Sequence, residues 1–138
     1  MKRNVSITKI MTPEVQTVHV GQKLSEVRAT MMAGKFHHVP VVSGKKLLGI
    51  LSATDLLKAS YQADTDERQV DAVLDHTVSI ESLMQKYPVT LRQNQTVRDA
   101  VAIFAEGLFH GLPVIDDDEN LVGLVTTTDV IRYMLEQY

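Results

Sequence analysis

The stretch "GLVTTTDV", residues 123–130, occurs a second time in the chain as "GILSATDL", residues 49–56. In both copies a glycine and apolar residues are followed directly by hydroxyl-bearing residues and one aspartate. The apolar part suits a buried strand, and the polar part suits the first turn of a helix. The duplication therefore indicates a strand-to-helix junction that the chain builds twice.

The repeat extends well beyond this junction. A shift of 73 places aligns "VSITKIM" (5–11) with "VSIESLM" (78–84), and "GKFHHVPVV" (34–42) with "GLFHGLPVI" (107–115). Such a period is typical of an architecture made of two similar units, in which each repeat covers the apolar surface of the other.

The alignment also places the boundaries of the repeats. One extra residue in the acidic turn 116–120 moves the shift to 74, which aligns "LLGILSATDLL" (47–57) with "LVGLVTTTDVI" (121–131). We interpret the chain as a tandem repeat: repeat one in residues 1–60, a linker with a short helix in 61–77, and repeat two in 78–138.

Each repeat is expected to form the same elements. Ser6 and Ser79 are suited to cap a short leading helix, and short extended pieces follow at 15–18 and 89–91. An amphipathic helix, two strands joined by a polar hairpin turn, and a last helix complete the repeat. The apolar positions of the amphipathic helices are Leu24, Val27, Met31 and Met32 in the first copy, and Val97, Ala100, Val101 and Phe104 in the second.

The expected fold class is therefore α/β (α+β), with two pseudo-twofold-related repeats of order β-α-β-β-α packed through their sheets. Two related clefts would then lie between the repeats.

Composition excludes several classes of protein. Of the 138 residues, 44% are hydrophobic and 22% charged, which is typical of a globular domain. The net charge of -3 offers no basic surface for nucleic acid, and no run of 18 apolar residues could span a membrane. The chain has no cysteine, and therefore no disulfide or thiolate site. We expect a soluble cytoplasmic domain.

The repeated hydroxyl–carboxylate pattern has two interpretations. A helix N-terminus exposes unpaired N–H groups that suit an anion, while a nearby carboxylate can accept hydrogen bonds from the vicinal hydroxyls of a ribose. Together these groups suit a nucleotide. Alternatively, Thr54-Asp55 and Thr128-Asp129 serve only as helix caps, and the sequence does not separate the two interpretations.

Catalytic and metal functions find little support. No Gly-x-Ser-x-Gly elbow or Walker-type phosphate loop is present. His37 and His38 are adjacent on a strand and would point to opposite faces, so they are poorly placed to chelate one ion. We expect a protein that is not an enzyme, without a metal site and without a required cofactor.

The ordered pattern resembles a known family. The motif Gly–apolar–apolar–Ser/Thr–x–x–Asp, following a strand with proline in "HHVPVV" or "HGLPVI" and present twice, is similar to paired cystathionine-β-synthase (CBS) domains, often called a Bateman module. The resemblance covers residues 5–133. It implies binding of an adenosine-containing ligand (AMP, ADP, ATP or S-adenosylmethionine) in the clefts between the repeats.

The resemblance also implies roles for individual residues. Asp55 and Asp129 would take the ribose hydroxyls. Ribose or phosphate would be approached by Ser52, Thr54, Thr126, Thr128, His37, His38 and His110. The adenine pocket would use Thr12, Pro13, Val15 and Gln16 in the cleft of Asp129, and Tyr87, Pro88 and Val89 in the cleft of Asp55.

The chain departs from the family pattern where members often carry arginine, because His38 and Gly111 stand there instead. Histidine is only partly charged near neutral pH, so we expect weaker, pH-sensitive binding of polyphosphates and unequal clefts. Alternatively, Gly111 makes room for a bulkier ligand, and the sequence does not decide between these.

Two function classes remain. The first is a ligand-sensing regulatory module that signals in trans to an unknown effector protein; the second is an oligomerisation or scaffold module with vestigial clefts. Family members of this kind usually form homodimers through their last helices, where Tyr133 and Met134 are the candidate contacts. Packing within the chain is the alternative role for these two residues.

Overall fold

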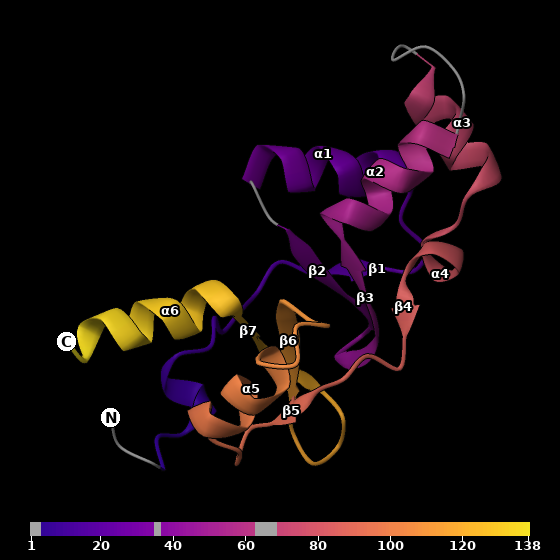
Figure 1. The fold of residues 1–138 in the computed structure, drawn as a ribbon. Helices are drawn as coiled ribbons and strands as arrows, with labels where there is room; N and C mark the ends of the chain where they lie inside the picture. Colours follow the sequence, from indigo (N-terminus) through magenta and orange to yellow (C-terminus); the bar gives the residue numbers. More distant parts are fainter. Residues whose placement is uncertain (1–3, 35–36, 63–68) are drawn as a thin grey trace. The chain divides into compact units, whose positions relative to one another are not determined.

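The computed structural model describes residues 4–34, 37–62 and 69–138, and the chain divides into two compact units (Figure 1). Gln16–Tyr87 form one unit, which we call the Asp55 unit. Met1–Val15 and Pro88–Tyr138 together form the other, the Asp129 unit. Each unit has its own sheet and its own apolar core, so each is described by itself.

The Asp55 unit contains a four-stranded sheet in the order β1-β2-β3-β4. Strand β1 is parallel to β2, and the other neighbours are antiparallel. Its elements are β1 (Val18–His19), α1 (Leu24–Gly34), β2 (His38–Ser43), β3 (Lys46–Ser52), α2 (Ala53–Gln62), α3 (Val70–Thr77), α4 (Ile80–Leu83) and β4 (Gln85–Lys86).

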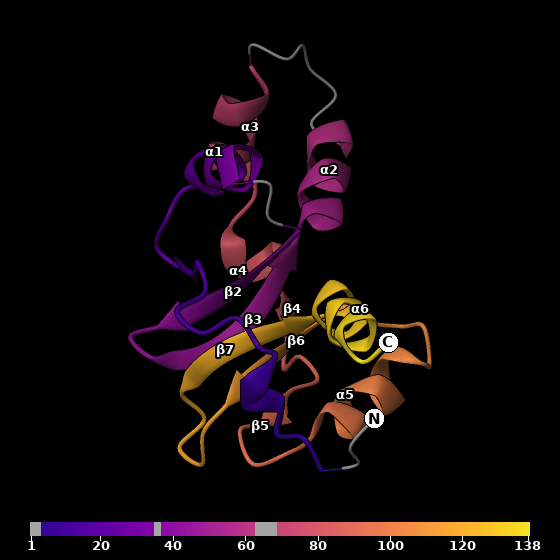
Figure 2. The ribbon, with the colours of Figure 1, turned by 90° about the vertical axis from the view of Figure 1, so that its left-hand side faces the viewer.

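The Asp129 unit contains a three-stranded sheet in the order β5-β6-β7, with β5 parallel to β6 and β6 antiparallel to β7. Its two long helices lie on the same side of the sheet (Figure 2). Its elements are η1 (Ile7–Lys9), β5 (Leu91–Arg92), α5 (Val97–Phe104), β6 (Gly111–Ile115), β7 (Leu121–Thr126) and α6 (Thr127–Glu136).

The expected β-α-β-β-α order is confirmed in both copies, as is the mixed α+β class. Ser6 and Ser79 cap the short leading helices η1 and α4, as their position predicts. The extended pieces expected at 15–18 and 89–91 are shorter and later, at Val18–His19 and Leu91–Arg92. The strands are limited to these residues because only they pair with β2 and β6.

Most, but not all, of the expected core positions are buried. Leu24, Val27 and Met31 recur on one face of α1 and are buried in the core of their unit. Met32 does not join this core: its side chain is 70% exposed, since a helix turns by about 100° per residue and carries it off the buried face. Val101 on α5 also lies outside the core of its unit, with 38% of its surface exposed.

The leading segment of each repeat packs against the other repeat. Strand β4, in the leading segment of the second repeat, pairs with β3 of the first, with Gln85 facing Ile50. Conversely, Thr12 exchanges two backbone hydrogen bonds with Leu124 on β7, of 2.8 and 3.0 Å. Figure 1 shows the indigo N-terminal segment beside the orange and yellow elements of the second repeat. Each unit is therefore built from both repeats.

Two glycines make room for this exchange. A Cβ added at Gly49 would lie 2.7 Å from the carbonyl oxygen of Gln85, and one added at Gly123 would lie 3.0 Å from that of Thr12. Cβ atoms in proteins essentially never lie as close as 2.7 Å to such an oxygen, and a distance of 3.0 Å is rare. The glycine that opens each duplicated motif is therefore needed because the leading segment of the other repeat lies directly against it.

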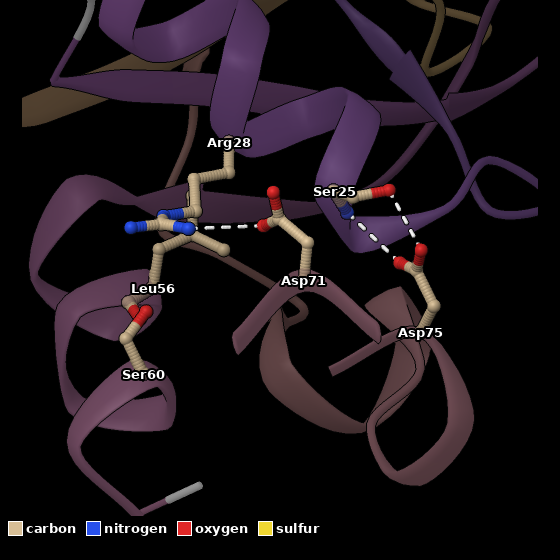
Figure 3. Close-up of polar contacts among 6 residues, drawn as sticks. All are labelled: Ser25, Arg28, Leu56, Ser60, Asp71 and Asp75. Atoms are coloured by element: carbon tan, nitrogen blue, oxygen red, sulfur yellow. Dashed lines mark hydrogen bonds and ion pairs between the residues drawn. The ribbon is translucent and has the colours of Figure 1, made fainter. Parts of the chain in front are cut away.

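The linker helix α3 is fastened to α1 by two polar contacts (Figure 3). The carboxylate of Asp75 accepts hydrogen bonds from the backbone N–H of Ser25 at 3.0 Å and from its hydroxyl at 2.7 Å. Arg28 Nη1 pairs with Asp71 Oδ1 at 3.0 Å. Within the stretch assigned to the linker, α3 spans Val70–Thr77, while residues 63–68 lie outside the described residues.

Apolar packing completes this attachment, because Val70 and Leu74 of α3 are buried in the core of the Asp55 unit. The hydrogen bonds from the Ser25 backbone and then from its hydroxyl hold the pKa of Asp75 below its usual value of 3.8. None of the helices in the described part of the chain is long and apolar enough to cross a membrane.

Replacing Gly123 by alanine is expected to lower the free energy of unfolding by about 1–3 kcal/mol, because the new methyl group overpacks against Met11 and Thr12. Urea denaturation of the purified variant measures the change. Gly21→Ala is the matched control, since a Cβ there meets nothing within 4 Å. Equal losses in the two variants would contradict the close-approach explanation.

Asp75→Ala is expected to lower stability by about 1 kcal/mol at pH 7, a magnitude typical of a lost helix cap. Because the pKa of Asp75 is lowered in the folded state, its contribution is present above the usual pKa of 3.8 and is lost as the pH falls through the folded-state value. The difference in urea midpoint between wild type and variant should therefore be constant from pH 5 to 7 and shrink below about pH 4. A difference that grows on acidification would refute the assignment.

Candidate functional site

The duplicated motif forms a reciprocal capping box at the start of α6. Thr126 donates to Asp129 Oδ2 from its backbone N–H at 2.8 Å and from its hydroxyl at 3.1 Å. In return, the backbone N–H of Asp129 donates to Thr126 Oγ1 at 3.3 Å. The two side chains thereby satisfy backbone donors that the first turn of a helix leaves unpaired.

The first copy forms the same box at the start of α2. The backbone N–H of Ser52 donates to Asp55 Oδ2 at 3.1 Å, and the backbone N–H of Asp55 donates to Ser52 Oγ at 3.1 Å. Both aspartates are half-buried, so each carboxylate is held in place and still reaches the surface of its unit.

A third box of this kind begins α5, where Asp99 Oδ2 accepts from the N–H of Thr96 at 2.9 Å and from its hydroxyl at 3.1 Å. This box lies outside the duplicated strand-to-helix motif, and the sequence motif did not mark it. Its presence shows that a hydroxyl–carboxylate pair at this spacing caps a helix by itself, so the box alone is no sign of a ligand.

The polar groups that the capping boxes do not use are more informative about a ligand. Oδ1 of Asp129 has no hydrogen bond to any residue that the structure describes, and the same holds for Oδ1 of Asp55. The hydroxyl-bearing residues Thr54 and Thr128, second in their helices, are exposed. Each unit therefore presents one carboxylate oxygen, one hydroxyl and a helix N-terminus together, which suits a ligand with vicinal hydroxyls and an anionic or polar tail.

The histidines reach the same helix ends through their backbone. The carbonyl oxygen of His37 accepts from the N–H of Ala53 at 2.8 Å, and that of His110 accepts from the N–H of Thr127 at 3.0 Å. The side chains of His37 and His110 are exposed, and His38 is half-buried. Among the residues described, no group of three or more His, Asp or Glu side chains is placed to hold a metal ion.

The proposed adenine segments divide unevenly between the units. Thr12, Pro13 and Val15 lie in the unit of Asp129, and Tyr87 lies in the unit of Asp55. Gln16 belongs to the Asp55 unit, and Pro88 and Val89 belong to the Asp129 unit. The division follows from the exchange of leading segments, which ends between Val15 and Gln16 and between Tyr87 and Pro88.

One feature of these segments has no signal in the sequence. Glu14 and Tyr87, which occupy equivalent positions of the two repeats, both have left-handed backbone, with φ of 48° and 51°. Left-handed backbone at a bulky side chain is uncommon and strained. The alignment could have paired the two positions, but neither is the glycine or asparagine that normally marks such a turn.

The comparisons with known proteins identify the family and the fold. The family model of the CBS domain matches the chain twice, over residues 7–62 and 80–136. An uncharacterized protein of Methanocaldococcus jannaschii is 28% identical over 94% of this chain, which spans 47% of that relative. A CBS domain-containing protein of Dictyostelium discoideum is 26% identical over 96% of this chain and 92% of its own length. The chain spans only 24% of another relative, a homoserine O-acetyltransferase of Methanohalobium evestigatum.

Solved structures share the fold. CBSX2 of Arabidopsis thaliana, in complex with AMP, has a TM-score of 0.81 at 24% identity, covering 96% of this chain and 98% of that one. The CBS domain pair of protein MJ0100, in complex with 5′-methylthioadenosine and S-adenosyl-L-methionine, has a TM-score of 0.78 at 24% identity, covering 94% and 99%. At this level of identity the likeness establishes the fold.

Substituting Tyr87 tests whether the left-handed turn is strained. Tyr87→Gly is expected to leave the free energy of unfolding unchanged or to raise it by up to about 1 kcal/mol, because glycine adopts positive φ without cost. Tyr61→Gly, at an exposed tyrosine within α2, should instead lower it by about 1 kcal/mol. Thermal denaturation followed by circular dichroism compares the two; a similar loss in both variants would rule out strain at Tyr87.

Proposed function

Because the chain belongs to the CBS domain family and carries the domain twice, we propose that it is a regulatory module that binds adenosine-containing ligands at the starts of α2 and α6. The observation that carries the proposal is the repeated placement of an aspartate Oδ1, a threonine hydroxyl and a helix N-terminus after β3 and after β7. Single capping residues are common, whereas the same three groups in two equivalent places suit one class of ligand that binds at both.

The ribose is assigned to the aspartates. Oδ2 of Asp55 and Asp129 accepts the backbone donor of its own box, and Oδ1 remains to accept a ribose hydroxyl. A ligand can thus bind without breaking the helix cap. Thr54 and Thr128 would approach the ribose or the 5′ substituent, together with Ser52, Thr126 and the nearby histidines.

The ligand class follows from the chemistry of this set and from the family. The fold of this chain is shared with CBS pairs whose structures contain AMP, 5′-methylthioadenosine or S-adenosylmethionine. For this chain we propose AMP, ADP, ATP or S-adenosylmethionine as the ligand, read out by a partner protein in trans and without catalysis.

Self-association is part of the same proposal. Helix α6 exposes an apolar stripe at Ile131, Met134 and Leu135, and Tyr133 beside it is half-buried. Side chains at positions i, i+3 and i+4 share one face of a helix, and the exposed Tyr138 follows just beyond the end of α6. We propose that a second copy of the chain covers this face.

A scaffold module with vestigial sites is the alternative function. The capping boxes at Ser52–Asp55 and Thr126–Asp129 are complete without a ligand, as is the box at Thr96–Asp99. The caps therefore have a structural role of their own, and a protein that no ligand stabilises would be best explained as a scaffold.

Thermal-shift measurements and calorimetry against AMP, ADP, ATP, S-adenosylmethionine and NADH test the proposal. A ligand that binds only the folded protein adds about 2.7 kcal/mol of stability at 100 times its dissociation constant. Asp55→Ala and Asp129→Ala should each reduce the ligand-dependent rise in Tm by removing one ribose acceptor.

The control for both variants is Asp99→Ala, which removes the same kind of capping box from α5. It should lower the Tm of the free protein by an amount similar to the other two while keeping the full ligand-dependent rise. A protein that forms dimers but responds to none of the ligands would favour the scaffold function.

A further inference from the structure

The two sites differ at the position that faces the first hydroxyl of each motif. In the antiparallel ladder of β2 and β3, His38 lies opposite Ser52, whereas in β6 and β7 Gly111 lies opposite Thr126. Side chains at directly opposed positions project from the same face, with Cβ atoms about 5 Å apart. An imidazole therefore stands beside the hydroxyl of Ser52, while the equivalent place beside Thr126 holds no side chain.

The hydroxyls themselves are used differently. The hydroxyl of Thr126 donates its proton to Asp129 Oδ2 at 3.1 Å. Ser52 Oγ accepts from the N–H of Asp55, but its own proton has no acceptor among the residues that the structure describes. The first site thus has a spare donor where the second has none, and a spare donor favours an anionic oxygen.

Charge differs in the same direction. Lys86 of β4, which pairs with Gly49, occupies the position that Pro13 holds beside β7. Tyr87 likewise occupies the position that Glu14 holds in the other unit. At both positions the leading segment of the Asp55 unit therefore carries the more positive residue of the pair.

Resting on the function proposed above, we infer that the two sites divide adenosine ligands by the charge of the 5′ substituent. The Asp55 site takes an adenosine with a 5′-phosphate, which His38, Ser52 and the N-terminus of α2 can bind together. The Asp129 site takes an adenosine with an uncharged thioether or a cationic sulfonium, because the Thr126 hydroxyl is already donated to Asp129 and Gly111 offers no imidazole to a phosphate. Gly111 leaves room for the larger sulfur-linked group.

Isothermal titration calorimetry with two probes tests this division. AMP represents the phosphate class and 5′-methylthioadenosine the uncharged class. Asp55→Ala should abolish the tighter AMP event and leave the binding of 5′-methylthioadenosine unchanged. Asp129→Ala should do the reverse. A mixture of both probes should give two independent binding events on the wild-type protein.

Reciprocal variants at the distinguishing position sharpen the test. His38→Gly should weaken AMP binding about tenfold, as expected for a lost hydrogen bond to a charged phosphate, without changing the affinity for 5′-methylthioadenosine. His38→Asn removes the imidazole while keeping a side chain, and should also weaken AMP binding if His38→Gly disturbs folding. Gly111→His should strengthen AMP binding at the Asp129 site. His19→Asn, at an exposed histidine of β1, is the matched control and should alter neither affinity.

The outcomes separate this inference from the proposed function. If both probes bind but compete for the same site, or if Asp129→Ala removes the tighter AMP event, the division of ligands is wrong and the sensing function stands. If neither probe binds the folded protein, the sensing function and the division fail together. Loss of AMP affinity on His38→Gly and on His38→Asn, with the Asp129 site unaffected, supports the division.

Discussion

The exchange of leading segments over Gly49 and Gly123 is the constraint on which both units depend. Without it, one side of β3 and one side of β7 would have no backbone partner, and such exposed sheet edges are prone to pair with other chains. Gln85 and Thr12 supply the missing backbone partners. Because the same two strands lead directly into α2 and α6, the exchange also fixes where the helix N-termini and their aspartates lie.

Because a carboxylate has two oxygens, Asp55 and Asp129 can serve both the fold and the ligand site that we propose. One oxygen completes the cap of the helix, and the other has no partner among the described residues. The cap holds this second oxygen in a fixed direction, which would lower the entropy cost of binding the proposed ligand. Asp99 uses the same cap at α5, so the position after a duplicated strand, rather than the cap, distinguishes the candidate sites.

Local features of the fold were predictable from the sequence, since they follow from short-range patterns. The element order, the caps at Ser6 and Ser79 and the helix in the linker belong to this group. Contacts over long sequence distances were not, because a repeat alignment groups residues by copy and says nothing of exchange. The bond between Asp75 and Ser25 and the place of Gln16 in the Asp55 unit are of this kind.

The candidate site was predictable in its residues but not in its chemistry. The spacing Ser/Thr–x–x–Asp suits a capping box and a ribose site equally, and both uses fit one carboxylate. The left-handed backbone at Glu14 and Tyr87 was beyond prediction, since neither residue type favours it. The contrast between His38 and Gly111 was visible in the sequence, but its position opposite Ser52 and Thr126 required the strand register.

The Asp129 unit is built from two separate segments of the chain, and this affects the order in which the chain can fold during synthesis. The Asp55 unit is continuous, Gln16–Tyr87, and can form as soon as its last residue leaves the ribosome. Thr12 is made more than a hundred residues before its partner Leu124. The apolar residues Ile7 and Met11 therefore lack their native cover until the second repeat has been made, and apolar surface exposed in such an interval is prone to aggregation.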